Sequence, residues 1–244
     1  MKFYRKEGQH ILKDRSLLKR IVRYGNIGRN DDVLEIGCGT GNLTEFLLEN
    51  AGTVYGIEKD GRFIKFLEER FKEELKNGRL ILIGRDAVKA EWPEFTKFVS
   101  NIPYMISTEI TLRLMNSKYE VAVVMYQREF AERLVAEPGT KKYGRLSVMA
   151  RAFCRAEIME YVKPQAFFPR PKVDSAVVRI IPVPRIEVRN FENFERLVRV
   201  AFSMRRKKFG KIAKILELDI PEKLENERPE NIPPEVYAEL SERL

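Results

Sequence analysis

The chain has 244 residues, of which 44% are hydrophobic, and its formal net charge is +9. This length allows one large domain or one domain with a small appendage, and the apolar content supports a sizeable core. Two isolated cysteines, Cys38 and Cys154, exclude a disulfide framework and a cysteine-based zinc site. No secretory leader is recognised, and no apolar run reaches the length of a membrane span. We therefore expect a cytoplasmic protein that is not inserted in a membrane.

The positive charge is concentrated in two stretches. Residues 1–23 contain eight lysines and arginines, and residues 196–214 contain eight more with no acidic residue. The last segment, 217–244, reverses the sign with nine acidic against three basic residues. A basic balance of this kind favours an anionic partner, with nucleic acid ahead of a membrane surface.

Helices and strands are expected to alternate along most of the chain. After a basic arm over residues 1–10, apolar periodicity predicts helices over 14–24, 41–50, 61–76, 108–116, 128–136 and 144–153. Apolar runs predict strands near 32–36, 53–57, 80–83, 98–100, 121–125, 156–162 and 174–181. This alternation predicts an α/β, Rossmann-like fold: a mainly parallel, seven-stranded sheet with helices on both faces.

Two prolines, Pro182 and Pro184, interrupt this pattern and predict a domain boundary. We expect a first domain over residues 1–183 and a small helical domain over 190–244. In the second domain, apolar residues at helical spacing predict two amphipathic helices. The first apolar face consists of Phe191, Phe194, Leu197, Val198 and Ala201, and the second of Phe209, Ile212, Ala213 and Leu216. Lys207, Lys211 and Lys214 would then face outward, either to contact RNA or simply to keep the helix soluble.

A glycine-rich turn follows the first strand. Gly37, Gly39 and Gly41 occupy every second position, and a helix is expected to begin directly after them. Glycine allows positive φ angles and a close approach of a ligand to the backbone. The spacing differs from the G-x-G-x-x-G pattern of a dinucleotide fold and lacks the Gly-Lys-Ser/Thr ending of a P-loop. Together with Glu58 at the end of the second strand, this turn resembles the cofactor end of an S-adenosylmethionine-dependent methyltransferase. This stretch alone leaves open a nicotinamide enzyme or a plain glycine-rich turn with a surface acid.

Polar residues follow the next predicted strands. Glu58 ends the second strand, at the place where an acidic residue binds the hydroxyls of a cofactor ribose. Asp86 follows the third strand, where it could accept a hydrogen bond from the cofactor's adenine amine, and Asn101 ends the fourth. Because ligands of parallel sheets bind at the carboxyl ends of the strands, we expect Gly37, Glu58, Asp86 and Asn101 to lie along one edge.

The tetrapeptide Asn101-Ile102-Pro103-Tyr104 points to methylation of a planar exocyclic amine. The amino lone pair of adenine is delocalised into the ring, so acceptors for its two N–H bonds would stabilise the charge that develops in the transition state. The side-chain oxygen of Asn101 and the carbonyl of Ile102 could supply them, with Tyr104 stacked on the base. The alternative is an ordinary proline turn with a buried tyrosine.

Several motifs together resemble the family of ribosomal RNA adenine dimethyltransferases, which dimethylate two adjacent adenines near the 3′ end of small-subunit RNA. The motifs are Gly8–Asp14, Glu35–Gly41, Asn101–Tyr104, Tyr143–Val148 and Phe168–Val178. The resemblance covers residues 5 to about 210, and His10 with Met125–Ala131 resembles the archaeal and eukaryotic branch.

The resemblance implies particular roles at the site. It assigns cofactor contacts to His10, Leu12, Gly37, Gly39, Glu58, Asp86 and Asn101. It assigns the pocket for the target base to Asn101, Ile102, Pro103, Tyr104 and Phe168. The implied cofactor is S-adenosyl-L-methionine, with no metal, and the implied partner of this monomer is small-subunit ribosomal RNA or an assembling small subunit.

Three other functions remain open. One is a large-subunit adenine methyltransferase, which would share the pocket motif but not the stretch Phe168–Val178. A non-catalytic nucleic-acid-binding or assembly factor on the same fold is another, against which the intact site motifs argue. The third, a nicotinamide dehydrogenase, explains neither Asn101–Tyr104 nor the basic stretches.

Overall fold

The computed structural model describes residues 10–182 and 186–244, so the predicted basic arm lies almost wholly outside the described residues. The described chain forms two compact units. The first covers residues 10–131 and 157–182, and the second covers 132–156 and 186–244. Among the helices of the described residues, none combines the length and the apolar character needed to cross a membrane.

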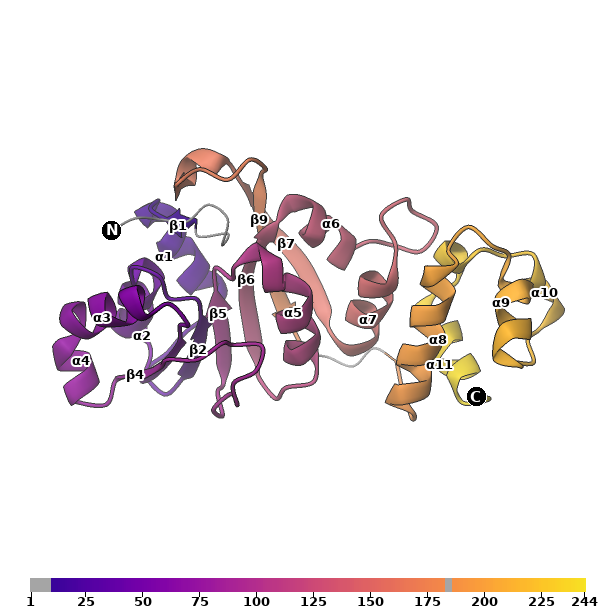
Figure 1. The fold of residues 1–244 in the computed structure, drawn as a ribbon, viewed down its shortest axis with the longest axis horizontal. Coiled ribbons are helices and arrows are strands. Elements are labelled where there is room, and N and C mark those ends of the chain that lie inside the picture. Colours follow the sequence, from indigo (N-terminus) through magenta and orange to yellow (C-terminus); the bar gives the residue numbers. More distant parts are fainter. Residues whose placement is uncertain (1–9, 183–185) are drawn as a thin grey trace. The chain divides into compact units, whose positions relative to one another are not determined.

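The first unit is built on a seven-stranded sheet (Figure 1). Its order is β4-β3-β2-β5-β6-β9-β7; β2 to β6 run parallel, and β9 is antiparallel to β6. The strands are β2 (Asp32–Ile36), β3 (Thr53–Ile57), β4 (Leu80–Ile83), β5 (Lys97–Ser100), β6 (Val121–Gln127), β7 (Arg155–Val162) and β9 (Ser175–Ile181). The predicted Rossmann-like, mainly parallel sheet is confirmed.

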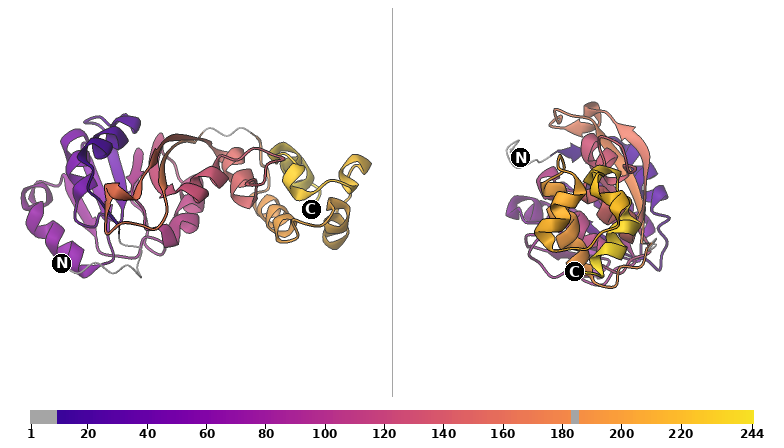
Figure 2. Two further views of the ribbon diagram at one scale, coloured as in Figure 1. Left: turned by 90° about the horizontal axis from the view of Figure 1, so that it is seen from above. Right: turned by 90° about the vertical axis from the view of Figure 1, so that its right-hand side faces the viewer.

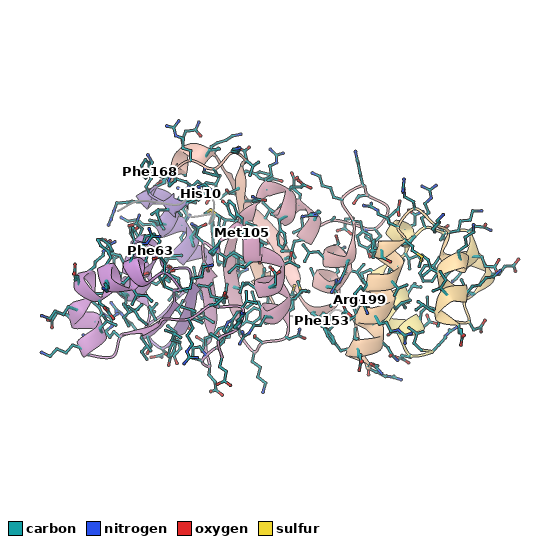
Figure 3. The ribbon with its side chains drawn as sticks, viewed as in Figure 1. His10, Phe63, Met105, Phe153, Phe168 and Arg199 are labelled. Carbon is teal, nitrogen blue, oxygen red and sulfur yellow. The ribbon has the colours of Figure 1, made fainter. Side chains whose placement is uncertain are left out.

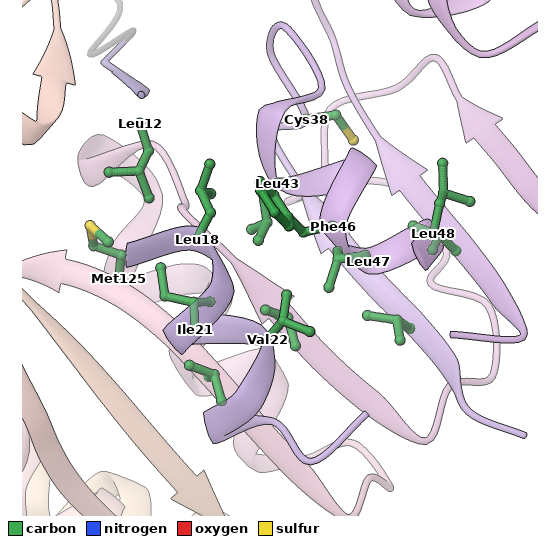
Figure 4. Packing of buried hydrophobic residues seen from close by; sticks show 14 of the residues in the cluster. Leu12, Leu18, Ile21, Val22, Cys38, Leu43, Phe46, Leu47, Leu48 and Met125 are labelled. Atoms are coloured by element: carbon green, nitrogen blue, oxygen red, sulfur yellow. The ribbon is translucent and has the colours of Figure 1, made fainter. Parts of the chain in front are cut away.

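Helices cover both faces of this sheet (Figures 1 and 2). They are α1 (Arg15–Tyr24), α2 (Asn42–Asn50), α3 (Gly61–Arg70), α4 (Lys72–Lys76), α5 (Ser107–Met115) and α6 (Arg128–Leu134). The central strands are therefore buried on both sides and read as continuous apolar runs, as in residues 121–126 of β6. Side chains of α1 and α2, among them Leu18 and Phe46, pack in one apolar cluster with Met125 of β6 (Figure 4).

A second, two-stranded sheet was not expected from the sequence. Strand β1 (Ile11–Leu12) pairs antiparallel with β8 (Phe167–Phe168), with Ile11 opposite Phe168. Strands of two residues carry no periodicity, which explains why sequence patterns miss them. This pairing connects the start of the described chain to the loop between β7 and β9.

Two local predictions differ from the structure. The helix expected over 61–76 is divided at Phe71, whose ring packs so closely on the glycine turn that a Cβ on Gly41 would lie 2.5 Å from it. The helix expected over 108–116 is shifted by one residue, since α5 begins at Ser107 and ends at Met115. The Ser107 side chain makes no capping bond and is buried in the first turn.

The second unit is helical. It contains α7 (Arg145–Phe153), α8 (Phe191–Ser203), α9 (Phe209–Leu216), α10 (Glu222–Glu225) and α11 (Pro234–Ser241). The expected apolar faces of α8 and α9 are buried, except that Phe191 is 40% exposed. Residues 132–156 were expected in the first domain, whereas they belong to the second unit because α7 packs against α8 and α11.

Candidate active site

The turn after β2 brings two chain segments close to the backbone. Gly37 has a φ of +75°, and a Cβ there would lie 3.0 Å from Cδ of Pro103. Gly39 has a φ of +55°, and its Cβ would lie 2.8 Å from Cδ1 of Ile11. Any larger residue would be strained and would push against β1 or the Asn101–Tyr104 segment. The glycines therefore keep open a cradle between these segments.

Every residue predicted to contact the cofactor lines one cavity of about 200 Å³, and so do Ile102, Pro103 and Tyr104. One water needs about 10–15 Å³ on the same measure, so the cavity has room for a small organic molecule. The four residues predicted to share an edge follow β2, β3, β4 and β5, which are neighbours in the sheet. Their side-by-side placement at the carboxyl edge is confirmed.

Glu58 is buried at the end of β3. Its Oε2 accepts a hydrogen bond from the backbone N–H of Gly39 at 3.0 Å, and its Oε1 accepts one from that of Asp60 at 2.9 Å. Burial raises the pKa of this carboxyl, and the two backbone bonds oppose the rise. Each carboxylate oxygen retains a second lone pair, so Glu58 is held in place and still able to accept bonds from ligand hydroxyls.

Glu35 also lines the cavity and was not predicted as a site residue. It lies within β2 and accepts a hydrogen bond from Oγ1 of Thr44 at 2.6 Å. Burial, with repulsion from Glu58, raises the pKa of Glu35 to about 7. The position of Glu35 within the otherwise apolar run 33–36 is the sequence signal that could have identified it as a site residue.

The turn that carries Asp86 is held from outside the cavity. Oδ1 of Asp86 accepts from the backbone N–H of Val88 at 2.9 Å. The carbonyl of Ala87 accepts from Nε1 of Trp92 at 2.9 Å and from Nη1 of Arg113 at 3.2 Å. The guanidinium of Arg113 also lies over the Trp92 ring, 4.4 Å from its centroid. Neither Trp92 nor Arg113 was predicted to support the site.

Asn101 is oriented by a hydrogen bond to the segment that leads into β1. Its Nδ2 donates to the carbonyl of His10 at 3.1 Å, so its Oδ1 is available as an acceptor in the cavity. His10 in turn forms a hydrogen bond from Nδ1 to the carbonyl of Pro169 at 2.8 Å. The predicted site residues His10 and Asn101, 91 positions apart, are thus directly bonded.

Tyr104 is fixed at its hydroxyl by Oγ of Ser175, 2.6 Å away. Burial raises the pKa of Tyr104 to about 12, so the ring stays neutral near pH 7. Phe168, labelled in Figure 3, differs from the other predicted residues: it does not line the cavity and is 58% exposed on β8, opposite Ile11. A role for Phe168 at the target base stays a prediction.

The fold and this cavity define a class of protein. The strand order, with an antiparallel strand inserted next to β6, differs from the 3-2-1-4-5-6 order of dinucleotide-binding dehydrogenases. The open glycine cradle and buried Glu58 fit a nucleoside cofactor, and Asn101–Tyr104 fits an amine acceptor beside it. The chain is a Rossmann-like methyltransferase, and its methyl donor is S-adenosylmethionine.

Known proteins identify the family. A family model described as "Ribosomal RNA adenine dimethylase" matches residues 1–235. A "Probable ribosomal RNA small subunit methyltransferase A" of Methanosarcina barkeri is 41% identical over 97% of this chain and 86% of its own. Its namesake in Pyrococcus furiosus is 46% identical over 86% of this chain and 74% of its own. The chain belongs to the ribosomal RNA adenine dimethylase family.

Two solved structures resemble the chain over nearly its whole length. A dimethyladenosine transferase from Plasmodium falciparum has a TM-score of 0.81 and 30% identity, covering 94% of this chain and 95% of its own. The 23S rRNA methyltransferase ErmE has a TM-score of 0.73 and 29% identity, covering 96% and 99%. The same fold therefore occurs in a dimethyladenosine transferase and in a 23S rRNA methyltransferase.

Proposed function

We propose that this chain transfers methyl groups to N6 of two adjacent adenosines near the 3′ end of small-subunit ribosomal RNA, twice per base. The observation that carries the proposal is the orientation of Asn101, whose amide nitrogen is bonded to His10 while its oxygen is left as an acceptor. The choice of the small subunit is supported by relatives of 41% and 46% identity that are named for that subunit.

The chemistry follows from the residues around the target amine. Oδ1 of Asn101 and the carbonyl of Ile102 would accept hydrogen bonds from the two N–H groups of the adenine amine. These hydrogen bonds would raise the nucleophilicity of N6, whose lone pair is otherwise delocalised into the ring. The ring of Tyr104, held by Ser175, would stack on the base, a contact worth about 1–3 kcal/mol. Bound S-adenosylmethionine supplies an electrophilic methyl group, so the chain itself needs to orient rather than activate it.

The remaining residues of the cavity would hold the cofactor. Glu58 would bind the ribose hydroxyls and Asp86 the adenine amine, with His10, Leu12 and the glycines Gly37 and Gly39 closing around them. Phe168 lies outside the cavity and is exposed, and it would contact the target base when RNA is bound. The enzyme would act as a cytoplasmic monomer on the assembling small subunit, and the second unit would add RNA contacts.

A large-subunit adenine methyltransferase is the second candidate, since the structure of ErmE covers the same length of chain. Small subunits and large-subunit RNA, both from a strain that lacks the corresponding methylase, would be incubated with the protein and labelled S-adenosylmethionine. The proposal predicts labelling of the small-subunit RNA. Labelling of the large-subunit RNA alone would establish the second candidate, and labelling of neither would favour a non-catalytic RNA-binding role.

A further inference from the structure

A second hollow, of about 380 Å³, lies in the first unit and has no lining residue in common with the cofactor cavity. Its lining includes the ring of Tyr161 and the basic side chains of Lys13, Arg20 and Lys163. Two carboxylates also line it, and both are engaged within the protein: Glu160 accepts from Arg20 at 2.9 Å, and Asp14 accepts from the first turn of α1. The hollow thus combines an aromatic ring with basic groups.

The aromatic ring is partly exposed and has a cation against it. Tyr161 is 50% exposed, and the guanidinium of Arg128 lies 4.7 Å from its ring centroid. Asp174 is shared by two cations, with Nζ of Lys163 at 2.8 Å and Nη1 of Arg128 at 3.7 Å. The cluster of Arg128, Lys163 and Asp174 therefore has two cations and one carboxylate, and its net charge is positive. Exposed aromatic rings flanked by positive charge are the combination that binds unpaired nucleotides.

This cluster adjoins the reaction site along the chain and across the sheet. Leu12 lines the cofactor cavity, and its neighbour Lys13 lines the hollow. On the sheet, the N–H of Arg128 donates to the carbonyl of Asp174 at 2.9 Å. The residue after Asp174 is Ser175, whose hydroxyl is bonded to Tyr104. An RNA strand with one base at Tyr104 would therefore have its neighbouring nucleotides within reach of Tyr161.

We propose that Tyr161, backed by Arg128, is a stacking platform for an unpaired nucleotide that flanks the target adenosine, and that Lys13 and Lys163 contact the adjoining phosphates. This inference rests on the proposed function, because it names how the RNA strand is held next to the target base. Stacking on an aromatic ring tolerates any base, so the platform selects single-stranded RNA rather than a sequence.

The test uses the full-length protein and two labelled RNAs that are unrelated to ribosomal sequence, a ten-nucleotide single strand and a duplex of the same length. Fluorescence anisotropy would measure their dissociation constants for Tyr161→Leu, Tyr161→Phe and Tyr161→Trp. We expect Tyr161→Leu to weaken single-strand binding about 5- to 150-fold, the equivalent of one lost stacking contact. Phe should bind like Tyr, Trp should bind at least as tightly, and duplex binding should not change.

A matched control is Phe66→Leu, which alters another partly exposed aromatic residue of the first unit, on α3. It should leave both affinities unchanged. Single-strand affinity that Tyr161→Leu leaves unchanged would overturn the proposal, as would an equal loss for the duplex. So would a loss in Tyr161→Trp as large as in Tyr161→Leu, because a structural role requires the original shape. The probe RNAs are not ribosomal, so an error in the proposed target would not alter this result.

Discussion

At the scale of single residues, the proposed function assigns to Asn101 the stabilisation of charge that develops on the target nitrogen. Asn101→Ala should slow methyl transfer about 100- to 1000-fold, the usual cost of one acceptor or donor aimed at a transition state. Single-turnover kinetics with saturating cofactor and RNA would measure this rate, and the dissociation constant of S-adenosylmethionine should change less than the rate.

A matched control separates catalysis from anchoring of β1. Nδ2 of Asn42 donates to the carbonyl of Leu12 at 2.8 Å, as that of Asn101 does to His10. Asn42→Ala therefore removes a similar tether without touching the target amine, and its rate loss should be much smaller. Equal losses in both variants would show that Asn101 acts only by holding β1.

Glu35 gives the protein a pH dependence that can be measured without substrate. Its folded-state pKa is raised from 4.5 to about 7. Folding then favours the protonated form, so the associated stability is full below pH 4.5 and is lost as the pH rises to about 7. Relative to wild type, Glu35→Gln should gain about 2 kcal/mol in the free energy of unfolding between pH 5 and pH 7.5.

Urea unfolding at these two pH values would measure this difference. Gln keeps the size of Glu and can still accept from Thr44, while repulsion of Glu58 disappears. The pKa of Glu58 is also raised, so part of the pH dependence should remain in the variant. If the free energy of unfolding changed with pH equally in wild type and variant, the pKa of Glu35 in the folded protein would not be raised.

At the scale of elements, the bond between Tyr104 and Ser175 ties the Asn101–Tyr104 segment to β9. A hydrogen bond of this kind contributes about 0.5–1.5 kcal/mol, so Ser175→Ala and Tyr104→Phe should each lower the methylation rate about 2- to 10-fold. The double variant should be no slower than either single one, because both changes remove the same bond. Additive losses in this cycle would show that the two hydroxyls act independently.

The parallel sheet could be predicted because each strand is a short apolar run that ends in a distinctive residue. Gly37, Glu58, Asp86 and Asn101 were found in this way, since the topology of parallel strands places their carboxyl ends together. Contacts between distant segments have no such local signal. The pairing of β1 with β8, the bond from Asn101 to His10 and the exposed position of Phe168 depend on the packed chain.

The extent of the second unit could not be predicted for the same reason. Helix α7 has ordinary helical periodicity, and nothing in its own residues indicates that it packs with α8 and α11. Prolines near residue 183 mark one of the three places where the chain passes between the units. The other two, at 131/132 within α6 and at 156/157 within β7, have no proline or glycine signal.

At the scale of the whole molecule, the basic surface of α9 is expected to add RNA affinity through charge. Lys211 and Lys214 on α9 and Lys207, two residues before it, are exposed, and none of them forms an ion pair with another described residue. Replacing all three by Gln should flatten the slope of log affinity against log salt by about 2. Cofactor affinity should not change.

The control is the triple variant of Lys65, Lys72 and Lys76, exposed lysines on α3 and α4 in the first unit. It changes the net charge by the same amount, so a smaller effect on RNA binding would assign the difference to position rather than to total charge. An unchanged salt slope in the α9 variant, with lowered thermal stability, would instead assign these lysines to the stability of the second unit.

The most direct test of the account is to map the methyl groups on small subunits from a methylase-deficient strain after reaction with the protein. Mass spectrometry of nuclease fragments would identify each modified base and count its methyl groups. We expect N6,N6-dimethyladenosine at two adjacent positions near the 3′ end of the small-subunit RNA, and far less of this product with Asn101→Ala after the same reaction time. Methyl groups on another atom, on a single isolated adenosine or at a distant position would contradict it.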